Sequence, residues 1–173
     1  NIVLPFTRGV AGPADYTPVG FSMPGNTTAA HQLATAYIMD SPLQVIAENP
    51  FYLMRTADLA PAVALLRDLP VAWDETIVLP ATILGKTAIF ARRLGTTWYV
   101  AALCTDPTSV EIAAKFLGQG DYTATSLYDD PTSEGVFQSV IRTIDRNDTL
   151  RIELEENGGG IIKIEAKTSP DRE

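Results

Sequence analysis

The stretch TAIFARRLGTTWYVAALC, residues 87–104, decides the fold of this chain. Each half shows an alternating pattern with a period of two, which predicts two strands. The Gly95-Thr96 step between the halves predicts a hairpin turn. In this hairpin Ala88, Phe90 and Arg92 share one face of the first strand. Trp98 and Tyr99 are expected on opposite faces of the second, with at most one of them in the core.

Runs with the same period of two follow the hairpin. Turn signals separate them about every eight to twelve residues, as in antiparallel β-sandwiches, so the second part of the chain is predicted to be a sandwich of about seven short strands. The runs are residues 110–116, 122–128, 136–144, 150–154 and 162–166.

Before Pro70 the pattern is different. Residues 2–6 are apolar and predict a short buried strand, and residues 9–26, rich in glycine and proline, predict a long loop. A helix is expected after Thr27 or Thr28 as N-cap, because the apolar residues that follow have helical spacing. The change of period at Pro70 predicts a boundary between two domains, residues 1–69 and 70–173.

Two more helices are expected before this boundary. Ser41-Pro42 predicts an N-cap and first helical residue, and Asn49-Pro50 is expected to end that helix. The third runs from about Ala57 to Arg67. About 70 residues with one strand and a few helices bury too little surface to be stable alone, so this part is expected to pack on the sandwich or on material outside the chain.

Composition excludes several classes of protein. The chain has 173 residues, 46% of them hydrophobic and 20% charged, which is typical of a globular domain. Thirteen Lys and Arg against 21 Asp and Glu give a net charge of −8, the wrong sign for a nucleic-acid partner. No apolar run is long enough to span a membrane, so no membrane partner is expected.

The residue types most used in catalysis are scarce. Cys104 and His31 are the only cysteine and histidine, so no disulfide and no multi-imidazole or multi-thiolate metal site is expected. Cys104 is expected to be a buried small residue on a strand. His31 is expected to be a helix residue with a satisfied imidazole.

Two other groups are candidates for function. Trp73-Asp74-Glu75 combines an aromatic ring with two carboxylates, as sugar sites do, but a strand-entry turn with surface charges is favoured. Asp15-Tyr16 lies in the long loop and is the better candidate, although a turn-forming Asp before Thr17-Pro18 is equally compatible with the sequence.

Several motifs resemble glycoside hydrolase family 97, which contains α-glucosidases and α-galactosidases. They stand in the family's order and approximate spacing over nearly the whole chain, and Gly9 and Ala14 are small departures from the usual pattern. The motifs are LPFTRGVAGPADYTP (residues 4–18), AHQLA (30–34), SPLQ (41–44), PVAWDET (70–76), ARR (91–93) and TWYV (97–100).

The resemblance implies an α+β fragment of a longer enzyme. Residues 1–69 would be the last strand and closing helices of a (β/α)₈ barrel, and residues 70–173 the C-terminal β-sandwich. The family's general acid, its nucleophile or bases and its calcium-binding carboxylates lie upstream of the first motif. The resemblance therefore implies no catalytic residue, metal ligand or cofactor in this chain. It places Asp15 and Tyr16 at the wall of the substrate pocket, because they follow the last barrel strand.

Partners and location follow from the same resemblance. The upstream part of the same enzyme is the expected partner, α-linked oligosaccharide is the expected substrate of the parent, and the periplasm is the expected compartment. The apolar start without Met suggests a fragment. Without the barrel, the helix face around Leu33, Tyr37 and Ile38 would be uncovered, which predicts self-association.

Two alternatives remain open at this point. One is a carbohydrate-binding module that stacks sugars on exposed aromatic rings, for which the candidates are Trp98, Tyr99, Tyr122 and Tyr128. The other is a free-standing enzyme that uses Asp15, Asp74 or Glu75.

Overall fold

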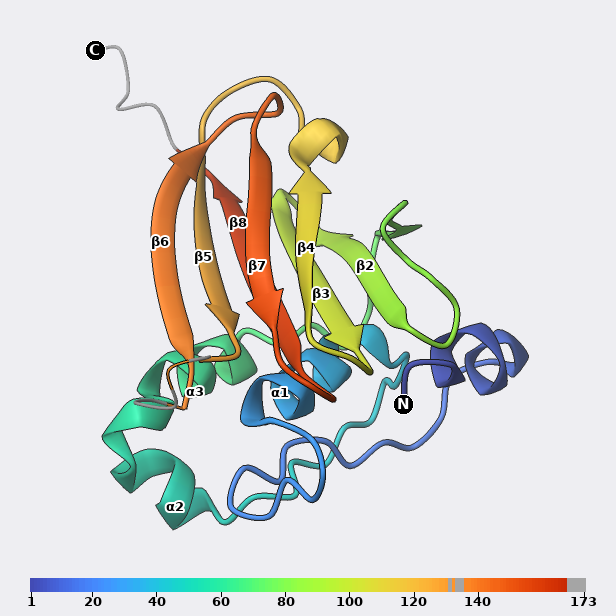
Figure 1. The fold of residues 1–173 in the computed structure, drawn as a ribbon, viewed down its shortest axis with the longest axis vertical. Helices are drawn as coiled ribbons and strands as arrows, with labels where there is room; N and C mark the ends of the chain where they lie inside the picture. The colour runs from blue at the N-terminus through green and yellow to red at the C-terminus, as the bar shows by residue number, and fades with distance from the viewer. Residues whose placement is uncertain (131, 133–135, 168–173) are drawn as a thin grey trace.

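The computed structural model of the protein describes residues 1–130, 132 and 136–167. A six-stranded antiparallel sheet is its centre, with strand order β1-β2-β3-β8-β5-β6, and a two-stranded sheet of β4 and β7 covers one face (Figure 1). The strands are β1 Glu75–Val78, β2 Thr87–Leu94, β3 Thr97–Cys104, β4 Thr108–Ala113, β5 Tyr122–Tyr128, β6 Gln138–Ile144, β7 Thr149–Leu154 and β8 Gly159–Ala166.

Helices lie on the other face of the large sheet, so the described chain has three layers (Figure 1). No helix within the described residues is long and apolar enough to cross a membrane. The α-helices are α1 Ala29–Ile38, α2 Pro50–Arg55 and α3 Ala60–Arg67, and the short 3₁₀ helices are η1 Leu4–Phe6, η2 Arg8–Ala11, η3 Ala57–Leu59 and η4 Ala114–Phe116.

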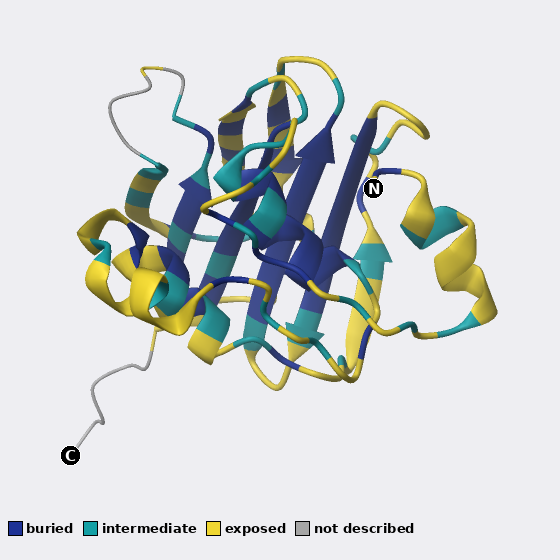
Figure 2. Cartoon of the chain, turned by 90° about the horizontal axis from the view of Figure 1, so that it is seen from below, coloured by how far each residue is buried: buried dark blue, intermediate teal, exposed yellow. Residues whose placement is uncertain are grey.

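Alternating side chains of β2 and β3 contribute to two separate hydrophobic cores, one on each face of the large sheet. Ile89 and Trp98 face the two-stranded sheet, where they pack among the buried residues of β4 and β7. Phe90 and Tyr99 face the helices and pack among the buried residues of α1 and α3. Residues of both strands are therefore buried on both faces (Figure 2).

The burial of Trp98 and Tyr99 differs from what the sequence predicted. They lie on opposite faces, as predicted, but both are core residues, only 6% and 5% exposed. The expectation that at most one would be buried is wrong because both faces of the sheet are covered. Tyr99 stacks on Tyr37 of α1, with ring centroids 5.3 Å apart.

Helix α1 lies close against β8 at a glycine. A Cβ at Gly159 would come within 2.7 Å of the Cα atom of His31 and 3.0 Å of the carbonyl oxygen of Ala102, so residue 159 has no room for a side chain. Thr28 caps the helix as predicted, and its hydroxyl accepts a hydrogen bond from the backbone N–H of His31 at 3.0 Å.

The apolar face of α1 corrects a second expectation. Leu33, Tyr37 and Ile38 are 0–1% exposed because the large sheet covers them. The predicted uncovered face is wrong, since the helical part packs on the sandwich. The Tyr37 hydroxyl also donates a hydrogen bond to the carbonyl oxygen of Leu65 at 2.7 Å, which ties α1 to α3.

The predicted strand at residues 2–6 is also wrong. Residues 4–6 form the 3₁₀ helix η1, and no strand within the described residues pairs with them. Local hydrogen bonds satisfy the backbone instead, from the N–H of Leu4 to the carbonyl oxygen of Asn1 at 3.0 Å and from Phe6 to Val3 at 3.2 Å. Apolar β-prone residues form a strand only where a neighbouring strand pairs their backbone groups.

The helix predicted between Ser41-Pro42 and Asn49-Pro50 is wrong, because residues 41–49 form no helix. Residues 42 and 43 form a bend instead, and Gln44 makes a parallel bridge with Tyr16. Asn49-Pro50 begins α2 instead of ending a helix: the Asn49 side chain accepts a hydrogen bond from the N–H of Phe51 at 2.8 Å. An Asn-Pro pair fits a helix start, with Asn as N-cap and Pro as the first helical residue.

Other elements agree with the sequence. The third helix is found as η3 and α3, and the strands after the hairpin are found with shifted ends, such as β4 ending at Ala113 and β6 beginning at Gln138. Gly95 takes a positive φ of 59° at the hairpin turn.

Candidate functional site

A pocket of about 720 Å³ lies between the N-terminal 3₁₀ helices and the edge of the large sheet. The loop at residues 12–16, the end of α1, the segment at residues 71–76 and the side chains of Phe90 and Arg92 on β2 enclose it. It lies between the helical part of the chain and the sandwich, which is a frequent place for ligand or domain contacts.

Asp15 and Tyr16, the predicted wall residues, both line this pocket. Backbone hydrogen bonds position their loop: the N–H of Ala14 donates to the carbonyl oxygen of Asp40 at 3.2 Å, and that of Val45 to Tyr16 at 3.1 Å. Asp15 is exposed and Tyr16 is half-buried. Burial raises the pKa of the Tyr16 hydroxyl, and a side-chain hydrogen bond with Thr35 partly offsets that rise, so the phenol stays neutral at physiological pH.

Arg92 lies at the β2 end of the pocket and is only 6% exposed. Its guanidinium carbon is 5.5 Å from the ring centre of Trp73 and 5.6 Å from that of Phe90. Its Nε and Nη1 atoms are buried and have no hydrogen-bond partner among the described residues. Burial lowers the pKa of Arg92, and the charge of Asp40 opposes that shift.

The neighbouring Arg93 forms ion pairs with both carboxylates of the Trp73-Asp74-Glu75 turn. Its guanidinium lies 3.1 Å from Glu75 and 3.6 Å from Asp74, while Asp74 also accepts a hydrogen bond from the N–H of Gly95 at 2.7 Å. The favoured interpretation of this turn as a strand entry with surface charges is confirmed. Trp73 is half-buried and packs edge-on against Tyr99.

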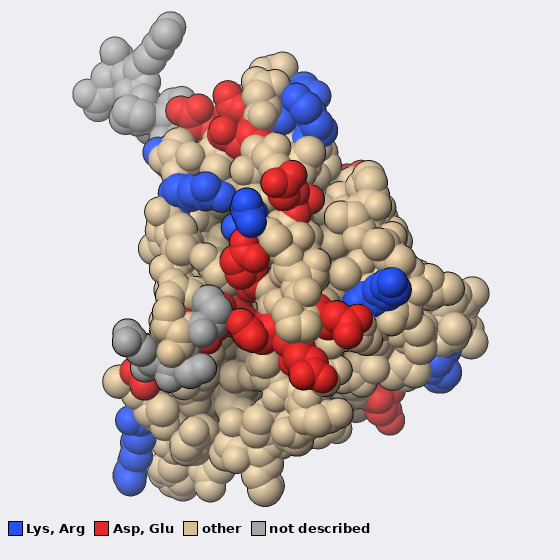
Figure 3. Space-filling model, viewed as in Figure 1, with Lys and Arg blue, Asp and Glu red and all other residues tan. Residues whose placement is uncertain are grey.

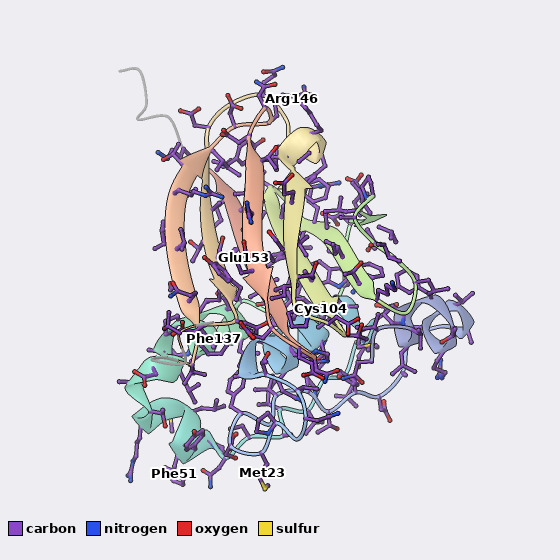
Figure 4. All side chains as sticks on the ribbon, in the orientation of Figure 1. Met23, Phe51, Cys104, Phe137, Arg146 and Glu153 are labelled. Atoms are coloured by element: carbon purple, nitrogen blue, oxygen red, sulfur yellow. The ribbon has the colours of Figure 1, made fainter. Side chains whose placement is uncertain are left out.

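His31 and Cys104 are structural, as expected. The imidazole Nδ1 of His31 lies 3.2 Å from the carbonyl oxygen of Gly158, and Nε2 lies 3.1 Å from the side-chain amide of Asn1. The Cys104 thiol lies at the end of β3 (Figure 4) and donates to the carbonyl oxygen of Glu155 at 3.0 Å. Burial raises the pKa of this thiol to about 11, so it is a poor nucleophile.

The sequence missed Arg92 as a site residue. The available signal was its position in the strand pattern, because Arg92 shares a face with the apolar residues Ala88 and Phe90. A charged side chain on a buried face points to a partner or to a site. Within the described residues, no group of three or more His, Cys, Asp or Glu side chains is placed to hold a metal ion.

The fold defines a class of protein, a β-sandwich with one sheet face covered by helices of the preceding segment. The family described as glycosyl-hydrolase 97 C-terminal, oligomerisation, matches residues 72–165. The chain therefore belongs to this family, as the C-terminal portion of a glycoside hydrolase family 97 protein.

Two named relatives are similar to nearly the whole of this chain. A retaining alpha-galactosidase from Bacteroides thetaiotaomicron is 29% identical over 95% of this chain, and a probable retaining alpha-galactosidase from Streptomyces bingchenggensis is 31% identical over 90%. The chain spans only 27% and 24% of those two proteins, about a quarter of their length.

Solved structures share the fold. A family 97 enzyme from Pseudoalteromonas sp. strain K8, in complex with acarbose, matches 96% of this chain and 28% of its own, with a TM-score of 0.84 and 29% identity. A beta-arabinopyranosidase matches 79% of this chain and 21% of its own, with a TM-score of 0.66 and 28% identity.

Proposed function

We propose that this chain is the non-catalytic C-terminal portion of a family 97 α-glycosidase, whose parent hydrolyses α-glycosidic bonds of oligosaccharides in the periplasm. The observation that carries the proposal is the similarity to named α-galactosidases over at least 90% of the chain. Residues 1–69 would close the barrel of the parent, and residues 70–173 would brace it. An α-galactoside is the first substrate to test, and an α-glucoside is the second.

The chemistry of the described residues supports a non-catalytic role. Glycoside hydrolysis needs two carboxyl groups on either side of the scissile bond. Asp74 and Glu75 contact Arg93, which leaves Asp15 as the remaining candidate of the free-standing enzyme hypothesis. The described residues contain no cluster of three or more Asp, Glu, His or Cys side chains that could hold the calcium implied by the family, so its ligands are proposed to lie upstream.

Asp15 and Tyr16 are proposed to border the substrate site of the parent, or to brace the acid-bearing loop of the barrel. Their position on the pocket wall supports this proposal. In the parent, Asp15→Ala is expected to lower kcat/KM while the melting temperature stays within about one degree. An unchanged kcat/KM together with an unchanged melting temperature would remove Asp15 from the site.

The second candidate, a carbohydrate-binding module, has less support. Such modules present exposed aromatic rings. Trp98, Tyr99 and Tyr122 are all less than a tenth exposed, and Tyr128 is half-buried against the core.

Self-association is proposed as a further role, since the family description includes oligomerisation. The test of the whole proposal compares the parent enzyme with the 173-residue chain in assays with 4-nitrophenyl α-galactoside and α-glucoside. Turnover is expected from the parent and not from the chain. Sedimentation equilibrium of both proteins should show oligomers. Turnover by the chain itself would overturn the non-catalytic assignment.

A further inference from the structure

Arg92 is a buried cation whose partner is not among the described residues. Its Nε and Nη1 atoms are buried and have no hydrogen-bond partner in the part of the chain that the structure describes, although the side chain lines the pocket. Asp40 is the acid whose charge acts on it, but the two side chains form no ion pair within the described residues. Arg93, one residue along the same strand, contacts both Asp74 and Glu75.

A buried guanidinium without a partner lowers the stability of the folded state. Leaving one buried donor unsatisfied costs about 1–3 kcal/mol, and more for a charged group. The flat faces of Trp73 and Phe90 hold the guanidinium by cation–π contact but satisfy none of its N–H groups. The group that completes this site therefore supplies anionic acceptor atoms, and a carboxylate matches the guanidinium fork in two parallel hydrogen bonds.

The rim of the pocket favours a protein partner over a free anion. Leu4 and Val71 line it and are 39% and 63% exposed. Val10 and Leu43, next in sequence to lining residues, are 78% and 61% exposed. A buried arginine surrounded by apolar side chains that exclude water is the arrangement of a protein–protein hot spot.

We propose that the Arg92 pocket receives an Asp or Glu side chain from the part of the parent's barrel that lies upstream of residues 1–69, and that this ion pair is the central contact of that upstream part with the sandwich. The inference rests on the proposed function, in which this chain is the C-terminal portion of a longer glycosidase. The two alpha-galactosidase relatives are about four times as long as the segment that this chain matches, so the parent has many residues outside this chain that could supply the side chain.

The test labels exposed carboxyl groups of the parent with a carbodiimide and glycine ethyl ester, and peptide mass spectrometry measures the labelling rate of each site. In Arg92→Met, which keeps an apolar stem in the pocket, one carboxyl group outside residues 1–173 is expected to react at least tenfold faster than in the wild type. The matched control is Arg93→Met, in which only Asp74 and Glu75 should react faster.

A second variant keeps the test interpretable if Arg92→Met fails to fold by circular dichroism. Arg92→Lys retains the charge without the fork, and the same single carboxyl group should then react at an intermediate rate. Labelling that rises at no upstream carboxyl group in a folded Arg92 variant, or that rises equally in Arg93→Met, would overturn the proposal.

A free carboxylate is the competing occupant. We expect sodium acetate to raise the melting temperature of the 173-residue chain no more than sodium chloride at equal ionic strength. An acetate-specific rise that Arg92→Met abolishes would place a free anion in the pocket and overturn the assignment to the barrel. Absence of α-glycoside turnover by the parent would reject the proposed function alone, because the labelling result does not depend on activity.

Discussion

Single buried polar side chains hold the helical layer on the sandwich. His31 connects α1 to the turn before β8 through Gly158. Asp129, directly after β5, holds the same turn within the sandwich, because its Oδ2 atom accepts the N–H groups of Glu155 and Gly159 at 2.9 Å. The partners of His31 Nδ1 and Asp129 Oδ2 are backbone atoms far away in the sequence. Their roles are therefore structural, and their titration should affect stability more than activity.

We expect His31 to make stability depend on pH. Burial lowers the pKa of its imidazole below 6.5, so between pH 7.5 and 5.5 the unfolded chain takes up this proton more readily than the folded chain. The free energy of unfolding should fall as the pH falls, by less than about 1.4 kcal/mol per pH unit from this one group. Urea unfolding of wild type and His31→Gln at both pH values measures it, and equal slopes for the two proteins would contradict it.

Cys104 should resist alkylation in the folded state. Its thiol is completely buried, and burial raises its pKa to about 11, so the thiolate is rare at pH 8. Iodoacetamide is expected to label Cys104 at least a hundredfold more slowly in the native chain than in 6 M guanidinium chloride. Mass spectrometry of timed samples gives both rates, and rapid native labelling would show that the end of β3 opens.

Packing between α1 and β8 depends on Gly159. A side chain there would meet the backbone of His31 and Ala102, which cannot move without separating the two elements. Gly159→Ala should therefore lower the free energy of unfolding by about 1–3 kcal/mol, the usual cost of overpacking. Thermal or urea unfolding followed by circular dichroism measures this loss.

Gly20→Ala provides the matched control for this variant. A Cβ at residue 20 would lie 3.6 Å from the carbonyl oxygen of Met23, an ordinary contact distance. Its effect should stay within about 0.5 kcal/mol. If both variants lose the same stability, the close approach of α1 to β8 is not the cause.

The outer surface of the whole molecule is uneven. Figure 3 shows acidic side chains gathered over the face of the β4 and β7 layer, in agreement with the net charge of −8. The helical side instead carries exposed apolar residues: Phe51 and Met54 of α2 are 62% and 65% exposed (Figure 4 labels Phe51). Residues three apart on a helix share a face, so these two form one apolar surface.

We expect this α2 surface to contribute to self-association of the 173-residue chain. Phe51→Asp should lower the association constant at least tenfold in sedimentation equilibrium without lowering the melting temperature, because the side chain is exposed. Ile141→Asp on β6, 68% exposed at the far edge of the large sheet, is the control. If only Ile141→Asp weakens association, the chains pair through the sheet edge instead.

Much of the fold was predictable because its signals are local. Alternation in residues 87–104 and the Gly95 turn specified the β2–β3 hairpin, Thr28 specified the start of α1, and the motif at residues 4–18 indicated the family. The predicted domain boundary at residue 70 stays a prediction. Asp15 and Tyr16 were placed on the pocket wall from their loop position, and both do line that pocket.

What the sequence by itself determined, then, is the β2–β3 hairpin, the start of α1 and family membership, because each depends on neighbours within a few residues or on a linear motif. Only the tertiary structure decided that both sheet faces are covered, that residues 4–6 are not a strand and that two buried nitrogen atoms of Arg92 have no hydrogen-bond partner among the described residues. These features depend on which groups distant in the sequence lie close together in the fold. A strand needs a neighbouring strand to pair its backbone groups, and an aromatic ring is buried only if another element covers it. A buried cation needs an anionic partner, and the local sequence does not identify that partner.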